Sequence, residues 1–348
     1  EAIGKCGTDN MLDALTSITS YKLKDTVLLE GQAWGIYRFS WRGKVSPQGT
    51  AKMLDFATAV KYHPSVRLIG AHYLARAKNI VLENGDSLIA PALAREDDPR
   101  IRMALAIALG KTSGDRAANA LLYQYNIESD YRVKCNILRA LGNFDYEKVK
   151  PTAYQALNDQ NTAVAVTAAD FFLEHGKAEE ASTYWQLAKT PGGRWQVQLQ
   201  LYAAAAKHLP YGFEESRKYL NWELRRRFES AANPYEKAAA IKALAGSGWN
   251  YRYIRDAGFA SNIAVVRSAA VEALAKIARI PNFNAYFGGG FTARRELTEC
   301  FQDAIESADA GMTAIAAETL RDSNLFFKET FDSIAILENT LKKLRLPQ

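Results

Sequence analysis

The stretch that decides the fold is PRIRMALAIAL, residues 99–109, because seven other segments of the chain repeat its pattern of apolar residues. The eight segments begin at Pro64, Pro99, Tyr131, Thr162, Arg194, Pro234, Ala264 and Ala310. Successive starts lie 35, 32, 31, 32, 40, 30 and 46 residues apart, which is the period of stacked helical hairpins. The sequence therefore predicts an α-solenoid of about nine hairpin units, counting incomplete ones.

Each segment is numbered from its start as position zero, and each residue advances about 100° around a helix. Positions seven and ten are apolar in all eight segments. Position two is apolar except at Gln196 and Glu236, and position six is small or apolar except at Gln200. These columns form one stripe wide enough to be a buried helix face.

The ends of the segments carry the signals of helix ends. Pro64, Pro99 and Pro234 sit where a first-turn proline costs no hydrogen bond. Glycines at 110, 142, 176 and 246 are typical of helix C-termini. Amphipathic partner helices are predicted between the segments, at 116–127, 146–158, 177–189, 213–230 and 291–307. No run alternates apolar and polar residues over strand length, so the chain is predicted to be all-α.

Position three is occupied by a cation in five segments, although its angle lies in the middle of the buried stripe. These residues are Arg67, Arg102, Lys134, Lys237 and Arg267. A buried cation must be paired or reach solvent. We expect Asp97 or Asp98 to pair with Arg102 and Asp130 to pair with Lys134, whereas the other three have no such carboxylate nearby in sequence. A structural ladder is favoured over the alternative, an anion-binding stripe.

The run Asp98-Pro99-Arg100-Ile101-Arg102 resembles the HEAT-repeat family, in which a loop Asp, a Pro, a Val or Ile and an Arg open the second helix of each hairpin. The resemblance covers nearly the whole chain and concerns architecture. It implies a right-handed α-α superhelix, a HEAT/armadillo-like solenoid, whose second helices line the concave wall.

Positions one, four, five and eight face away from the buried stripe, and they hold the candidate binding residues. Large planar and cationic side chains of this kind make binding hot spots. The candidates are Arg100, Arg132, Arg139, Trp195, Tyr202, Tyr235 and Lys242. They predict a surface for a protein or peptide partner.

The chain is expected to be a single repeat domain over 1–348, with irregular insertions near 34–47 and 281–291. The patch at 34–47 is either a distorted repeat or a lip of the groove. The opening Ala2-Ile3-Gly4-Lys5 matches the repeat end Ala108-Leu109-Gly110-Lys111, which predicts an incomplete repeat at each end and a piece of a longer protein.

Composition narrows the function classes. The formal charge of +6 and pI near 9.0 favour acidic partners weakly, without the Lys/Arg clustering expected of a nucleic-acid binder. The three cysteines have no CxxC spacing, so neither a disulfide framework nor a zinc site is predicted. No apolar run approaches the roughly 18 residues of a membrane span. We predict no metal and no cofactor.

Catalysis is not predicted, because three of the four histidines lie at helix termini and the one Glu174-His175 pair is not repeated. The remote alternative is a HEAT-like DNA glycosylase, with Asp170 beside Tyr202, or another nucleic-acid binder. The overall layout and the helix-like ending at 337–348 also resemble the HEAT-repeat part of bacterial proteins that carry a cyclophilin-type prolyl isomerase domain. That resemblance implies an accessory, client-holding region in the cell envelope, with catalysis only in a domain outside this chain.

Overall fold

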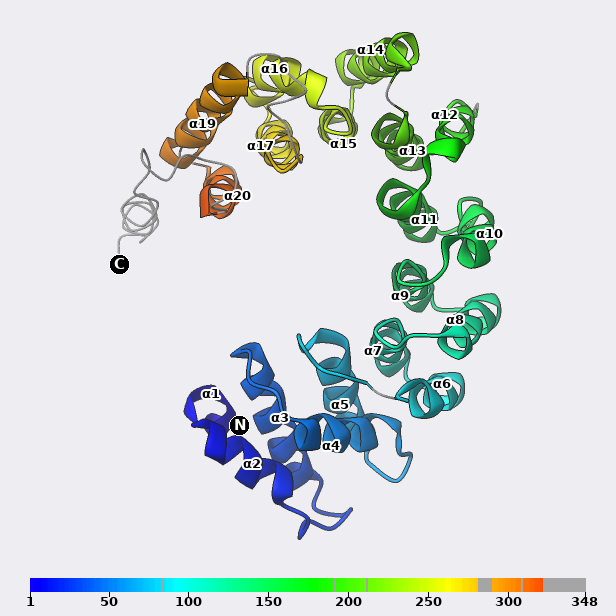
Figure 1. Ribbon diagram of the computed structural model, residues 1–348, viewed down its shortest axis with the longest axis vertical. Helices are drawn as coiled ribbons and strands as arrows, with labels where there is room; N and C mark the ends of the chain where they lie inside the picture. Colours follow the sequence, from blue (N-terminus) through cyan, green and yellow to red (C-terminus); the bar gives the residue numbers. More distant parts are fainter. Residues whose placement is uncertain (83, 191, 211, 281–289, 308, 322–348) are drawn as a thin grey trace. The chain divides into compact units, whose positions relative to one another are not determined.

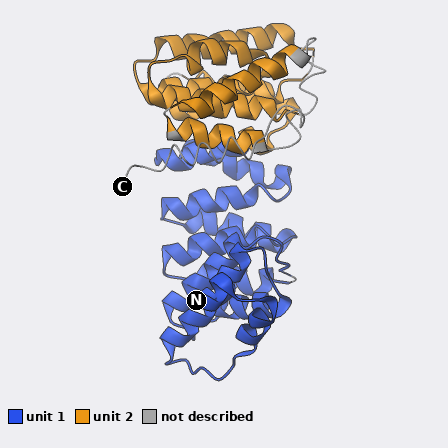
Figure 2. Cartoon of the chain, turned by 90° about the vertical axis from the view of Figure 1, so that its left-hand side faces the viewer, with its two compact units in different colours: residues 1–171 blue, residues 172–348 orange. Residues whose placement is uncertain are grey.

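The structure is a computed structural model that describes residues 1–321, except 83, 191, 211, 281–289 and 308. The described residues form helices and no strand (Figure 1), which confirms the predicted all-α class of stacked helical hairpins. The chain divides into two compact units, Glu1–Phe171 and Phe172–Gln348 (Figure 2). The single repeat domain over 1–348 stays a prediction.

Unit 1 is built from two layers of helices. The A layer holds the first helix of each hairpin: α2 Asp9–Ser17, α4 Pro47–Thr58, α6 Asp86–Arg95, α8 Asp115–Ile127 and α10 Tyr146–Ala156. The B layer holds the second helices: α3 Thr26–Trp41, α5 Pro64–Arg76, α7 Pro99–Leu109, α9 Tyr131–Leu141 and α11 Thr162–His175, within which the division into units falls. Figure 1 shows α7 and α9 on one side and α6, α8 and α10 on the other. The short helix α1 Ala2–Cys6 packs on α3, as α5 packs on α7.

Unit 2 repeats the same arrangement. Its B layer is α13 Trp195–His208, α15 Pro234–Leu244, α17 Ala264–Ala278 and α20 Ala310–Arg321, and each of these helices contacts the next. Its A layer is α12 Ala181–Ala188, preceded by a 3₁₀ turn at Ala178–Glu180, then α14 Glu214–Ser230, a third element and α19 Gly290–Glu306. The third element joins a 3₁₀ turn, Gly248–Asn250, to α16 Tyr251–Tyr253 and a π-helical turn, Ile254–Phe259.

The predicted apolar columns form the core of both units. Helices α7, α9 and α15 have the bounds that the sequence predicts. At position ten, Leu109 and Leu244 are 0% exposed, and Leu141 and Leu274 are 1% exposed. Position seven is buried in every segment. Because each B helix buries this face against its neighbours, the stack needs no separate core for each hairpin.

Two predicted irregular insertions have different outcomes. Residues 34–41 belong to the regular helix α3, so the insertion predicted at 34–47 is wrong apart from the short connection at 42–46. The buried side of α3 includes Leu29, Ala33 and Ile36, as expected of a second helix. Of the insertion at 281–291, only residues 290 and 291 lie in the described part, at the start of α19. The predicted helical ending at 337–348 lies outside the described residues.

Gly110 ends α7 for a reason other than a left-handed backbone conformation. Gly110 follows α7 with φ −64°, an ordinary right-handed conformation. A Cβ placed on Gly110 would lie 2.8 Å from the Cβ of Ala140 in α9, closer than two carbon atoms can approach without a shift. The glycine is needed there because two neighbouring B helices touch.

In unit 1 the cations at position three form a ladder with carboxylates from the loop in front of the next B helix. Arg102 on α7 donates two hydrogen bonds to Glu128, at 2.9 and 2.8 Å. Arg67 on α5 pairs with Glu96 at 3.2 Å. Lys134 on α9 pairs with Asp159 at 3.0 Å. The structural ladder is therefore present in unit 1, but the expected partners Asp97, Asp98 and Asp130 are wrong.

Each ladder carboxylate also holds the loop in front of the next B helix. Glu128 accepts hydrogen bonds from the backbone N–H groups of Ser129 and Asp130 and from the side chain of Gln124. Burial would raise the pKa of Glu128, but Arg102 and these donors hold it below its usual value. Because this folded-state pKa is lowered, the stabilisation is present above the ordinary value and is lost as the pH falls through the lowered one.

The cations of unit 2 are satisfied differently. Lys237 on α15 donates to the carbonyls of Phe228 and Glu229 at the end of α14, where the helix dipole favours a cation. Arg267 on α17 donates to the carbonyl of Ser261 at 3.0 Å and reaches Asp309 only at 4.0 Å. The position-three cations of unit 1 thus lie closer to their carboxylates than Arg267 of unit 2 does to Asp309.

Replacing Glu128 by Gln removes the charge that neutralises Arg102. Breaking a buried ion pair from one side costs about 3–5 kcal/mol, so we expect the free energy of unfolding in urea to fall by about 3 kcal/mol. Asp115→Asn is the matched control, because Asp115 is an exposed acid paired with Lys148 at the surface. Equal losses in the two variants would contradict a ladder role for Glu128.

Candidate functional site

A groove of about 340 Å³ crosses the B layer of unit 1 over three consecutive helices. Its lining residues are His72, Ala75 and Arg76 of α5, Arg100, Met103, Ala104 and Ile107 of α7, and Arg132 and Asn136 of α9. Most of them occupy positions one, four, five and eight of their segments. The structure thus brings together Arg100 and Arg132, two of the residues predicted from the sequence. We call this hollow the basic groove.

Two arginines stand at the starts of their helices beside capping aspartates. Arg100 donates to both oxygens of Asp98, and Arg132 to both oxygens of Asp130, with shortest distances of 2.7 Å. The hydrogen bonds from Arg132 lower the pKa of Asp130 to about 2. Both aspartates therefore stay ionised at neutral pH and offset part of the charge of these two arginines.

Two further arginines carry charge that no carboxylate of the described residues offsets. Arg76 donates a long hydrogen bond to the hydroxyl of Tyr37, at 3.5 Å. Arg139 donates to the side-chain oxygen of Asn136 at 2.9 Å, which places it at the edge of the basic groove. Within the described part of the chain, neither arginine makes an ion pair. Both are exposed, so both can meet an anion from solution.

The basic groove has apolar lining residues, and the groups around its histidine lower the pKa of that residue. Met103, Ala104 and Ile107 of α7 are apolar members of the lining, together with Ala75 of α5. Burial lowers the pKa of His72 below its usual value, and the nearby charges of Arg76 and Arg100 lower it further. His72 is therefore neutral at pH 7 and acts there as a polar lining group.

Helix α3 continues the exposed face of the B layer with aromatic residues. The guanidinium of Arg38 lies 4.0 Å from the ring centre of Trp41 and 5.2 Å from that of Trp34. Trp41 is 57% exposed. Of the two predictions for this segment, a distorted repeat is wrong, because α3 is a regular helix.

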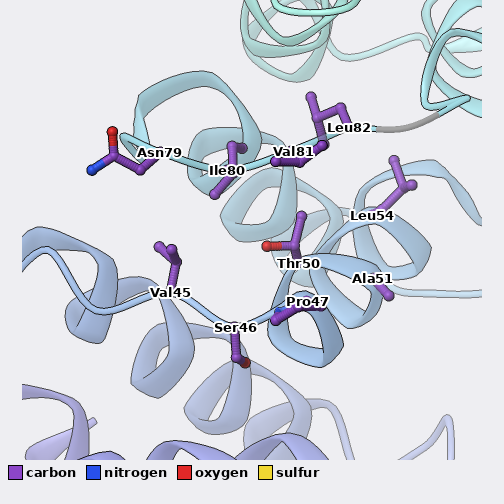
Figure 3. Close-up of a pocket in the computed structure, with 10 residues that line it drawn as sticks. All are labelled: Val45, Ser46, Pro47, Thr50, Ala51, Leu54, Asn79, Ile80, Val81 and Leu82. Atoms are coloured by element: carbon purple, nitrogen blue, oxygen red, sulfur yellow. The ribbon is translucent and has the colours of Figure 1, made fainter.

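An apolar pocket of about 480 Å³ lies at the loop edge of the same unit. Figure 3 shows the segment 79–82 on one side of this pocket and Val45, Ser46 and Pro47 on the other. Thr50, Ala51 and Leu54 of α4 complete the lining. Val81 is 72% exposed although it is apolar. We call this the apolar pocket.

A third hollow joins these two surfaces through residues that they share. Arg76 lines both the basic groove and the third hollow, and Asn79 and Ile80 line both the third hollow and the apolar pocket. Lys111 lines the third hollow, and its amino group donates to the carbonyls of Leu74 and Ala77 at the end of α5. One continuous path of lining residues thus runs over unit 1.

The candidate residues of unit 2 have separate outcomes. Tyr235 is 68% exposed, Trp195 is half-buried and Lys242 pairs with Glu272 on α17. Tyr202 is 1% exposed, so its predicted place on an exposed surface is wrong. The reason is that α13 is surrounded by α12, α14 and α15 and buries most of its length. The glycosylase alternative with Asp170 beside Tyr202 stays a prediction.

The described residues show neither a metal site nor a membrane-spanning helix. They contain no group of three or more His, Cys, Asp or Glu side chains placed to hold a metal ion. None of their helices combines the length and apolarity that a bilayer crossing requires. No carboxylate lines the basic groove, so His72 has no acidic partner within that lining for proton transfer.

Comparisons with known proteins identify no family for the chain. No family model matches, and no curated protein matches. Similar solved structures include an engineered protein, at 17% identity over 92% of this chain and 89% of that chain, with a TM-score of 0.41. Kap121p bound to Ste12p shares 13% identity over 97% of this chain and 46% of that chain, at a TM-score of 0.40. A chain from work on tubulin recruitment by TOG domain arrays shares 9% identity over 97% of both chains, at a TM-score of 0.29.

The pKa of His72 tests the electrostatics of the basic groove. Arg76→Gln removes a nearby positive charge, so the pKa of His72 should rise toward its usual value, as measured by NMR titration of the imidazole. Lys22→Gln removes an exposed positive charge in the loop before α3 and should leave this pKa unchanged. An unchanged or lower pKa in the Arg76 variant would show that the arginine does not act on His72.

Proposed function

We propose that this chain is a non-catalytic protein-binding scaffold or client-holding module built from HEAT-like repeats. The observation that carries the proposal is the basic groove, whose lining on three successive B helices combines arginines with apolar side chains. Arginine and aromatic side chains are the residues on which protein interfaces most often depend. The binding surface is the exposed face of the B layer, and the ligand is a protein or a peptide.

The exposed residues of both units support this function. Arg100, Arg132 and Arg139 lie on α7 and α9, and Trp41 extends the same face along α3. In unit 2, Trp195, Tyr235 and Lys242 are at least partly accessible. Isolated exposed aromatics are common on protein surfaces, so the proposal rests on the groove that the unit 1 residues line together.

The chain also resembles HEAT-repeat regions that lie beside cyclophilin domains, and this resemblance suggests a more specific role for the proposed scaffold. In that role the chain would hold a client next to a prolyl isomerase in the cell envelope. The full open reading frame that encodes this chain tests this second prediction directly. A cyclophilin domain in it would support the role, and a complete frame without one would exclude it.

Site-specific photo-crosslinking tests the scaffold function. A benzoylphenylalanine placed at Arg139, Trp41 or Tyr235 should give discrete, saturable protein adducts in an extract of the source organism. The same residue placed at Tyr123, a 62% exposed tyrosine of α8 in the A layer, is the control. Adducts of equal yield from both layers, or none from the B layer, would contradict binding at the B-layer face.

A further inference from the structure

We propose that unit 1 binds an extended acidic segment of a partner protein, with the partner's carboxylates in the basic groove and its neighbouring apolar side chains in the apolar pocket. This inference rests on the proposed protein-binding function and adds the chemistry of the partner. Three observations carry it: the charge of the groove, the continuity of the two surfaces and the composition of the apolar pocket.

The charge of the basic groove selects an anion. Its lining contains three arginines and no carboxylate. Arg100 and Arg132 are partly offset by their capping aspartates, whereas Arg76 at one wall and Arg139 at the edge make no ion pair in the described residues. A carboxylate can accept two parallel hydrogen bonds from one guanidinium, which favours acidic side chains as ligands of these two residues.

The continuity of the surfaces selects an extended ligand. The path passes from the basic groove through Arg76 to the third hollow, and through Asn79 and Ile80 to the apolar pocket. A compact ligand would occupy one hollow. A peptide in an extended conformation advances about 3.3 Å per residue and can place successive side chains along such a path.

The apolar pocket selects the residues that flank the acidic ones. Val45, Pro47 and Leu54 contribute from one chain segment, and Ile80 and Val81 from the other. Apolar surface left in water is costly, at about 25 cal/mol for each Å². Leucine or valine side chains of a bound segment would cover this surface and remove that cost.

A nucleic acid fits these residues less well than an acidic protein segment. A nucleic acid that followed the whole path would bring phosphates to the apolar pocket, whose lining holds no lysine or arginine to neutralise them. Neither the basic groove nor the apolar pocket has a Phe, Tyr or Trp in its lining on which a base could stack. Acidic residues followed by aliphatic ones match both hollows.

Fluorescence anisotropy with two labelled peptides tests the inference on the full chain. One probe is a poly-glutamate decapeptide, and the other replaces its second half by leucines and valines. We expect both probes to bind at low salt and the mixed probe to bind more tightly. Arg76→Glu with Arg139→Glu should weaken both by about tenfold or more, because two unpaired cations become anions.

Matched variants test the contributions of the basic groove and of the apolar pocket to peptide binding separately. Lys22→Glu with Lys24→Glu changes the net charge equally in an exposed loop outside the groove and should leave binding unchanged. Val81→Asp should weaken only the mixed probe. Val60→Asp is its control, because Val60 is 64% exposed and does not line the apolar pocket. Circular dichroism of each variant establishes that it is folded.

The outcomes distinguish this inference from the proposed function. Weaker binding by the charge-reversal pair but not by its control would support an acidic ligand. No binding of either peptide, or tighter binding of a single-stranded oligonucleotide than of the mixed probe, would overturn it. If crosslinked partners are still captured on the B layer in that case, the scaffold function survives and only the partner chemistry is wrong.

Discussion

A nearly buried carboxylate in the loop before a second helix is the constraint on which unit 1 depends. Glu96 and Glu128 are 8% and 7% exposed, and each binds the position-three arginine of the preceding B helix. These arginines lie within the stripe that packs the stack. Without an anion, a charge at that place would be too costly to bury. The carboxylate also accepts backbone N–H groups of its own loop, so one side chain joins two successive hairpins.

The ladder joins successive B helices, and the resulting alignment of these helices explains why a groove exists. When neighbouring B helices are aligned, residues with the same position number come to lie near one another on the exposed face. Arg100 and Arg132 hold position one of α7 and α9, while His72 and Ile107 hold position eight of α5 and α7. All four line the basic groove. The binding chemistry therefore occupies positions that the packing leaves free, and it can change without disturbing the core.

The sequence predicted the helices well and the contacts between repeats poorly. Helices α7, α9 and α15 were predictable because apolar periodicity, a capping residue and a final small residue agree at each. The partner of Arg102 was missed because it comes from the next repeat. The sequence did hold a signal for this partner. Glu128 lies two residues before the capping residue Asp130, and Glu96 lies two residues before the capping residue Asp98. Tyr202 was misplaced because periodicity assigns one buried face, whereas α13 is covered on several sides.

A double-mutant cycle on Arg67 and Glu96 tests the central claim most directly. Native-state hydrogen exchange of the amides in α5 and α7 reports the local free energy of opening for the full chain, for Arg67→Met, for Glu96→Gln and for the double variant. Direct coupling through the ladder predicts that the double variant loses less than the sum of the single losses, with an interaction energy of about 1 kcal/mol or more. An interaction energy near zero would mean that the pair does not join the repeats, and would contradict the account.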